Sequence, residues 1–326
     1  MLKLLNFSVD PWDLDKFGNN ADRMEAFLDR HGIAGFEMIQ YANWDDCAVP
    51  KSRIVAAHSC FWPSWLDFWR EDRDSLMRQF GDEATCREYY GFDSKSELVG
   101  YYRQSLDRAQ AAGVKYVVFH VSHAEMEHAY TYGFPYGDEE ITDAFIDMMN
   151  EIVGGSIYDF DIVFENHWYP GLTLLDRGVA EKLINGFKHP RKGFVLDIGH
   201  MMNTDLELTS ESEAADYIAD KLKSLGSLAR MIKVVHLNSS LTGEYVRQVI
   251  KEESAYNPTL DFKTRHSLLY KHISMIDTHQ PFMDPSIRRV IELASPDYLV
   301  YEFCVETLPE LEHCVMSQNG VMDGIS

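Results

Sequence analysis

Four short apolar runs in the sequence each end in a side chain that can bind a metal ion. The runs are DIVFEN, GFVLDIGH, IKVVHLN and DYLVYEF, and the residues at their ends are Glu165, Asp197, His236 and Glu302. Runs rich in Val, Ile, Leu, Phe and Tyr are typical of buried parallel strands. If the carboxyl ends of these strands meet at one face, the four side chains converge. Carboxylate and imidazole donors together then predict a divalent-metal site for Zn, Mn, Co or Fe.

Further residues at or near strand ends extend this set: His58 in VAAHSC, His120 in VVFHVSH, His200 in LDIGH, and Asp277 and His279 in MIDTHQPF. A single His or Asp at a strand end is more often a hydrogen-bonded loop anchor than a ligand. Here several otherwise apolar strands end in a charge, and an unpaired buried charge is costly. We therefore interpret the nine residues as candidate ligands of a shared centre. Glu37 in GFEMIQ is either a further polar contributor or part of a structural salt bridge.

The composition argues against several classes of function. The net charge of −22 disfavours general affinity for nucleic acid, because binding phosphates requires clustered Lys and Arg. No apolar run approaches a membrane span, and the N-terminal apolar stretch is too short for a signal peptide. The five cysteines, at positions 47, 60, 86, 304 and 314, form no CxxC pair and are expected to be reduced. We therefore expect a cytoplasmic protein without a nucleic-acid or membrane partner.

Eight strand-like runs alternate with helix-like segments along the chain. The runs span Leu2–Val9, Gly35–Tyr41, Ile54–Phe61, Tyr116–His123, Asp161–Asn166, Gly193–His200, Ile232–Asn238 and Tyr298–Phe303. Helical patterns cover Asn20–His31, Ser94–Ala112, Asp138–Val153 and Ser212–Leu225, and another helix is expected to begin near Asp284–Pro285. This alternation predicts an α/β fold, a single (β/α)8 barrel. No glycine-rich dinucleotide fingerprint follows any of the runs, which disfavours a Rossmann fold.

Two long connections interrupt the alternation, and each follows a strand. An aromatic-rich insertion at about 61–91 begins FWPSWLDFWR after the third strand, and a second insertion at about 241–271 follows the seventh. The aromatic segment is either a lid that stacks on substrate or a helical hairpin that packs on the barrel or on a second subunit. A C-terminal tail at about 307–326 follows the last strand. We expect one domain over residues 1–326, and assembly into a homo-oligomer stays open.

The order and placement of these motifs resemble the xylose isomerase-like barrels. This group includes sugar isomerases and epimerases, inosose dehydratases and family-two abasic-site endonucleases. The stretches that carry the resemblance are VFENHWYPG, FVLDIGHMMNT, VVHLNSS and LVYEF, with weaker support from VAAHSC, VVFHVSH and IDTHQPF. The resemblance spans about residues 2 to 306 and is more specific for fold than for reaction.

The isomerases and epimerases of this group imply one divalent ion on Glu165, Asp197, His236 and Glu302. The resemblance makes Glu165 and Glu302 a proton-transfer pair on opposite faces of a bound hydroxy ketone, with His200 contacting a substrate hydroxyl. The implied substrate is a small polyhydroxylated compound, a sugar or sugar phosphate. One departure is that Asn238 and two serines follow His236, where those enzymes often carry an Arg.

The endonucleases of the group imply a cluster of three metal ions. By that resemblance Glu165 bridges metals, with His58 and His120 on one ion and His200, Asp277 and His279 on another, while Asp197, His236 and Glu302 complete the third. Such a cluster would clamp a phosphodiester and activate water. The departure here is that the second insertion separates the Asp-x-His pair from the seventh strand. The sequence thus predicts a metal-dependent isomerase or epimerase, with a multinuclear phosphoesterase as the alternative.

Overall fold

Eight parallel strands form a closed barrel in the computed structural model, which describes residues 1–39, 48–252 and 255–323. The strands pair in sequence order, and β8 pairs with β1. This confirms the predicted (β/α)8 barrel. The strands are β1 (Leu2–Ser8), β2 (Gly35–Ile39), β3 (Ile54–His58), β4 (Tyr116–His120), β5 (Asp161–Glu165), β6 (Lys192–Asp197), β7 (Ile232–Leu237) and β8 (Tyr298–Tyr301).

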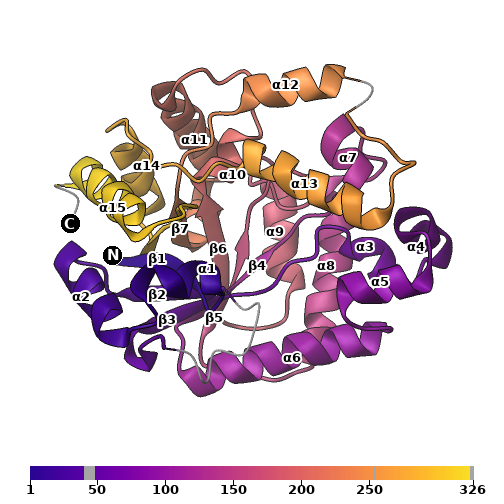
Figure 1. Ribbon diagram of the computed structural model, residues 1–326, viewed down its shortest axis with the longest axis horizontal. Helices are drawn as coiled ribbons and strands as arrows, with labels where there is room; N and C mark the ends of the chain where they lie inside the picture. Colours follow the sequence, from indigo (N-terminus) through magenta and orange to yellow (C-terminus); the bar gives the residue numbers. More distant parts are fainter. Residues whose placement is uncertain (40–47, 253–254, 324–326) are drawn as a thin grey trace.

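The helices surround the strands, as Figure 1 shows. They are α1 (Pro11–Leu14), α2 (Ala21–His31), α3 (Trp65–Arg70), α4 (Arg73–Phe80), α5 (Glu83–Tyr90), α6 (Lys95–Ala112), α7 (Met126–Thr131), α8 (Asp138–Val153), α9 (Arg177–Gly186), α10 (Ile198–Met202), α11 (Glu211–Leu225), α12 (Gly243–Lys251), α13 (Phe262–Ile276), α14 (Ile287–Ala294) and α15 (Leu308–Met322). Three short 3-10 helices are η1 (Asp15–Phe17), η2 (Lys51–Arg53) and η3 (Gly226–Met231). Among the described helices, none is both long enough and apolar enough to cross a membrane.

A small apolar cluster fills the interior of the barrel. It contains Leu4, Ala56, Tyr116, Val118, Val163, Val195, Val234 and Val300, one or two from almost every strand. Side chains two apart on a strand face the same side. Six candidate ligands therefore lie directly above this layer, each two residues after one of its members: His58, His120, Glu165, Asp197, His236 and Glu302. Alternate side chains of each strand thus face either the barrel interior and the site, or the large core between the strands and the helices.

The register of the strands sets these side chains at similar heights. His120 is paired with Glu165 across β4 and β5, and Asp197 is paired with His236 across β6 and β7. Both pairs stand at the carboxyl ends of their strands, the end of a barrel where the connections to the following helices begin. Distant parts of the sequence are therefore brought to one level by backbone pairing.

Three predicted strands end three residues earlier than expected. The runs predicted to reach Phe61, His123 and His200 end at His58, His120 and Asp197. The sixth strand stops because the side chain of Asp197 caps helix α10 and accepts the backbone N–H of His200 at 2.6 Å. His200 is therefore a helical residue. The predicted end of the second strand, residues 40 and 41, lies outside the described residues.

The helix expected near Asp284–Pro285 begins later, at Ile287, with Ser286 in the cap position. The Asp284 side chain instead accepts the N–H of Ser286 at 2.9 Å, which is a local turn that competes with helix formation. The prediction of the helix start was therefore wrong by two residues.

Helices α3, α4 and α5 occupy the aromatic-rich segment after β3. Trp65, Phe68 and Trp69 are buried in the main core, and the indole N–H of Trp65 donates to the Ser122 carbonyl at 2.7 Å. The side chain of Glu125, which follows β4, accepts two hydrogen bonds from Arg78 of α4 at 2.7 and 3.1 Å. These contacts fix the segment against the connection after β4 and favour the packing alternative over a mobile lid.

The segment between β7 and β8 contains α12 and α13, which contact each other and α7 (Figure 1). Residues 253–254 of the predicted insertion lie outside the described residues. The two ends of this excursion are joined by an antiparallel bridge in which Ser239 and Gln280 exchange backbone hydrogen bonds at 2.7 and 3.1 Å. The segment predicted as a C-terminal tail forms α15, which begins with a capping box of Thr307 and Glu310.

One carboxyl group in α3 makes stability depend on pH. Burial first, and then nearby Glu125 and Asp72, raise the pKa of Asp67 to about 6, although Arg78 and a hydrogen bond from Gln79 oppose the shift. Since the folded pKa exceeds the unfolded one of about 3.9, proton binding stabilises the fold below pH 4. That contribution is lost as the pH rises from 4 to 6.

We therefore expect Asp67→Asn to raise the free energy of unfolding at pH 7.5 by about 1–2 kcal/mol, a figure reduced from the full shift because the group is partly exposed. The gain should shrink toward zero at pH 4. Urea denaturation at both pH values measures it, with Asp74→Asn on the exposed side of α4 as the control. An equal effect at both pH values would contradict the expectation.

Candidate metal centre

The carboxylate of Glu165 lies at the centre of four imidazoles. His58 and His120 each place Nε2 at 3.0 Å from its Oε2 atom. On the other oxygen, Oε1 lies 3.2 Å from Nδ1 of His200 and 3.6 Å from Nδ1 of His236. Glu165 is 1% exposed, so both oxygens depend on these rings for compensation of their charge. Glu165 therefore lies between these four rings, and its role as a metal ligand stays a prediction.

Asp197 and His200 are set by the strand-to-helix junction at β6 and α10. Asn166, directly after Glu165, fixes this junction: its Oδ1 accepts the N–H of Asp197 at 2.8 Å and its Nδ2 donates to the carbonyl of Asp197 at 3.1 Å. The carbonyl of Asn166 also lies 2.9 Å from Nδ1 of His200. Asn166 was not among the residues predicted from the sequence, where its only signal is an amide directly after the candidate ligand at a strand end.

His236 and Glu302 complete this side of the centre. Nδ1 of His236 lies 3.2 Å from Glu302 Oε2 and 3.8 Å from Asp197 Oδ2. The amide of Asn238 donates to Asp197 at 2.9 Å and to Glu302 at 3.5 Å, so it joins the two carboxylates. Asn238 stands near the position where an Arg was expected from the resemblance, and it is fully buried.

Asp277 and His279 reach the same centre despite the excursion that precedes them. Asp277 Oδ2 lies 3.3 Å from Nε2 of His200 and 3.3 Å from Nε2 of His279. The hydroxyl of Ser240 donates to Asp277 Oδ1 at 3.1 Å, next to the bridge that closes the excursion. His279 also lies 3.8 Å from Glu302. All nine predicted residues therefore converge, and their binding of a metal stays a prediction.

The charges of the centre compensate one another within a buried space. Burial disfavours the ionised form of Glu165, but His120 and His236 outweigh it and lower its pKa well below the usual range. Burial likewise opposes protonation of His236, yet Glu37, Glu302 and Glu165 raise the pKa of that imidazole well above its ordinary value. Burial and the neighbouring carboxylates raise the pKa of Asp197 to about 7, against the influence of His200.

The donor set fits a divalent ion. Three overlapping groups each bring one donor atom per residue within 4.8 Å of one another: Glu37, His58 and His236; His58, His120 and Glu165; and Glu165, Asp197 and His236. Nδ1 of His120 and Nδ1 of His236 are buried and form no hydrogen bond with any described residue. Nitrogen and carboxylate oxygen donors of this kind suit Zn, Mn, Co or Fe. The residues therefore form a candidate metal centre.

Aromatic rings form part of the wall around the centre. Phe61 meets the ring of His120 edge-on, with 4.7 Å between centroids. Trp168 lies 5.0 Å from the ring of His200 and stacks on His167 at 3.9 Å. His167 is buried, and burial together with the charges of His200 and His120 holds its pKa well below the usual range. Of the aromatic residues that open the first insertion, Phe61 is thus one that reaches the centre.

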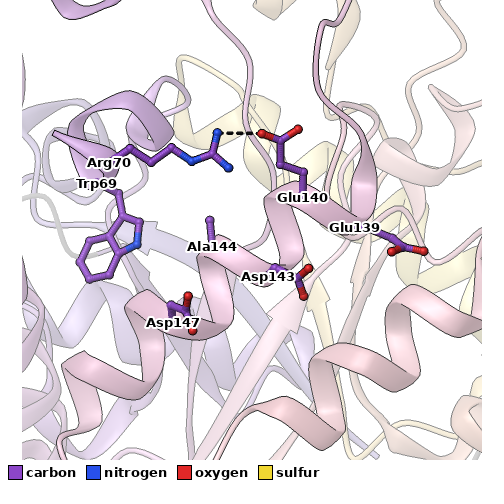
Figure 2. Close-up of a pocket in the computed structure, with 7 residues that line it drawn as sticks. All are labelled: Trp69, Arg70, Glu139, Glu140, Asp143, Ala144 and Asp147. Atoms are coloured by element: carbon purple, nitrogen blue, oxygen red, sulfur yellow. Dashed lines mark hydrogen bonds and ion pairs between the residues drawn. The ribbon is translucent and has the colours of Figure 1, made fainter. Parts of the chain in front are cut away.

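A separate hollow of about 540 Å³ lies between α3 and α8, and Figure 2 shows its lining. Its wall combines the faces of Trp69 and Arg70 with four carboxylates of α8. Arg70 pairs with Glu140 at 2.7 Å, and Lys182 pairs with Asp143 at 3.0 Å. None of the residues that line the hollow is a candidate ligand, so the hollow is not part of the candidate centre.

Comparisons with known proteins agree with the fold. The family described as xylose isomerase-like TIM barrel matches residues 25–297. A D-tagatose 3-epimerase-like protein has 13% identity and a TM-score of 0.51, covering 99% of this chain and 97% of that one. L-ribulose 3-epimerase has 12% identity and a TM-score of 0.50, covering 99% and 93%. The 3-keto-D-glucoside 4-epimerase YcjR from E. coli has 12% identity and a TM-score of 0.50, covering 99% of both chains. No curated protein matches the chain in sequence.

Gly199 is required by the packing of Asn238. A Cβ atom on Gly199 would overlap Oδ1 of Asn238 and crowd the hydroxyl of Ser240. We expect Gly199→Ala to displace Asn238 and to lower the free energy of unfolding by about 1–3 kcal/mol, as overpacking does. Thermal or urea denaturation measures the loss. Gly100→Ala in α6 is the control, because a Cβ there meets open space and a helical Ala is favoured by about 0.5–1 kcal/mol. A Gly199→Ala protein as stable as the wild type would contradict the expected crowding.

Proposed function

The chain belongs to the family of xylose isomerase-like TIM barrels, and on that premise we propose that it is a divalent-metal-dependent isomerase or epimerase of a small polyhydroxylated ketone. The main support for the proposal is that two glutamates, Glu165 and Glu302, approach the same ring nitrogen of His236. Glu165 and Glu302 lie 3.6 and 3.2 Å from Nδ1 of His236. A substrate bound beside this nitrogen would have a carboxylate within reach from each strand end.

In this proposal Glu165, Asp197, His236 and Glu302 hold the ion. A divalent ion bound there would polarise the carbonyl group of a hydroxy ketone and so acidify the adjacent C–H bond. One of the two glutamates then removes the proton from carbon with a carboxylate oxygen, and the other returns a proton to the opposite face, which inverts or moves the stereocentre. His200, between Glu165 and Asp277, contacts a substrate hydroxyl.

The charge of the barrel mouth supports an unphosphorylated substrate. In the described connections that run from the ends of β1 and of β3 to β8 to the start of the next helix, the sequence contains neither Lys nor Arg. The nearby Lys16 in η1 is itself paired with Asp13 at 2.7 Å. Recognition of a phosphate group usually relies on Arg, Lys or clustered backbone N–H groups. The surroundings favour a neutral, hydroxyl-rich compound over a sugar phosphate or a nucleic acid.

The approach of Asp277 to His200, and of His279 to Asp277, favours a second candidate, a multinuclear metal phosphoesterase. With these residues, His58 and His120 in place, the donors suffice for three ions around Glu165. Metal analysis of the purified protein separates the two candidates. We expect one tightly held ion per chain for the isomerase. Three ions, together with hydrolysis of phosphoesters, would replace the first proposal by the second.

Substitution of either glutamate tests the proton-transfer pair. We expect Glu165→Gln and Glu302→Gln each to lower turnover of a ketose substrate by about 10²–10⁴-fold, because an amide cannot accept the proton from carbon. Each variant should still exchange the carbon-bound hydrogen of one epimer with deuterated water, and the two variants should act on opposite epimers. NMR of ketoses incubated with Mn-, Co- or Zn-loaded protein measures both. Full turnover by either variant would contradict the assigned role.

A further inference from the structure

Glu37 interrupts the apolar interior of the barrel. It stands in the middle of β2 and is paired with Ala56 of β3, so it lies level with the layer of small apolar side chains below the candidate centre. The residue is 1% exposed. An isolated carboxylate at such a place is strongly destabilising unless partners satisfy it. The proposed proton transfer does not use this group.

Two side chains satisfy Glu37. The phenol of Tyr116, from β4, donates to its Oε2 atom at 2.6 Å. Nε2 of His236 lies 3.1 Å from Oε1 and 3.3 Å from Oε2. Since Tyr116 belongs to the apolar layer and is itself buried, it fixes the carboxylate from below while the imidazole contacts it from above.

The contact leaves the other nitrogen of His236 for the candidate centre. Nδ1 faces Glu302, Glu165 and Asp197 and forms no hydrogen bond with any described residue. When Nε2 donates its proton to Glu37, a neutral ring carries its lone pair on Nδ1, where a metal ligand needs it. The position of Glu37 thus selects which nitrogen is available.

We infer that Glu37, fixed by Tyr116, is a positioning residue that orients His236 and makes Nδ1 its metal-binding nitrogen. The inference rests on the proposed metal centre and goes beyond it, because Glu37 is not one of the four residues proposed to hold the ion and takes no part in the proposed proton transfer. A purely structural role would consist of filling space and neutralising charge, and it would leave the nitrogen that binds metal unchanged.

Glu37→Gln separates the two roles. The amide has nearly the same volume, and its oxygen can still accept from Tyr116. Its N–H groups then face Nε2 of His236, which must become the acceptor, so the ring proton moves to Nδ1. We expect the affinity for Co²⁺ to fall about 10–100-fold, the range for the loss of such a partner. The visible absorption of the cobalt-loaded protein should change as well, since the His236 donor is lost or displaced.

The matched control is Glu125→Gln, another buried glutamate, whose carboxylate accepts two hydrogen bonds from Arg78 and contacts no candidate ligand in the described part of the chain. Its affinity for Co²⁺ should stay within about twofold of the wild type. In the zinc-loaded wild type, ¹⁵N NMR should show His236 protonated at Nε2. Tyr116→Phe keeps Glu37 but frees it, and a smaller loss of affinity is expected.

The outcomes are distinct. A wild-type protein that binds no Co²⁺ overturns the proposed metal centre and the inference with it. Equal Co²⁺ affinity and an equal spectrum in the wild type and Glu37→Gln overturn the inference alone, as does a wild-type His236 protonated at Nδ1. If Glu37→Gln does not fold, Tyr116→Phe decides, and an unchanged affinity there overturns the inference.

Discussion

The burial of one carboxylate between four imidazoles is the constraint on which this site depends. Glu165 is buried at the end of a strand that cannot move without disrupting the barrel. Neighbouring groups must therefore compensate its negative charge. The surrounding carboxylates raise the pKa of His200 and the pKa of His236 above their ordinary values despite burial: Asp197 and Asp277 act most on His200, and Glu37 and Glu302 act most on His236. A divalent cation would compensate the charge of Glu165 in place of protonated imidazoles, and the imidazoles that bind it would lose their protons. A cluster of this kind is costly to maintain for stability alone, because a well-packed apolar group of similar size is often as stable or more so.

The barrel supplies the geometry through two simple rules. Alternation along the strands places six of the nine candidate ligands two residues above an apolar interior neighbour, and pairing between strands sets their heights. The connections that follow the strands supply the remaining candidate ligands. His200 comes from the first turn of a helix capped by Asp197, and Asp277 comes from the end of α13. The centre is thus assembled from a rigid ring of strand residues and a smaller set fixed by capping and side-chain hydrogen bonds. Glu37 and Asn238 belong to neither set, and each instead contacts the side chains that would bind the ion.

Much of this could be predicted from the sequence because the signals are local. An apolar run that ends in a metal-binding side chain identifies both a strand and the residue at its carboxyl end. Eight apolar runs with helices between them indicate a closed barrel. The ends of the runs were harder to predict, since residues such as Val121 and Ile198 continue the apolar pattern beyond the last residue of the strand. The position of Asn166 and Asn238 could not be derived from pattern, because an amide near a strand end has many uses. Which of the two readings of Glu37 applies also depended on register, and on the pairing of β2 with β3 in particular.

The bridge between Ser239 and Gln280 joins the two ends of the segment that contains α12 and α13. Ser239, just after β7, and Gln280, which follows α13, exchange backbone hydrogen bonds. The segment with α12 and α13 therefore leaves the barrel and returns to it at one narrow neck. The entropy of closing such a loop grows only slowly with its length. Segments of very different size, sequence or shape can therefore be exchanged above this neck while Asp277 and His279 keep their places. Substrate access at the barrel mouth could thus change during evolution through this segment, while the positions of the candidate metal ligands stay the same.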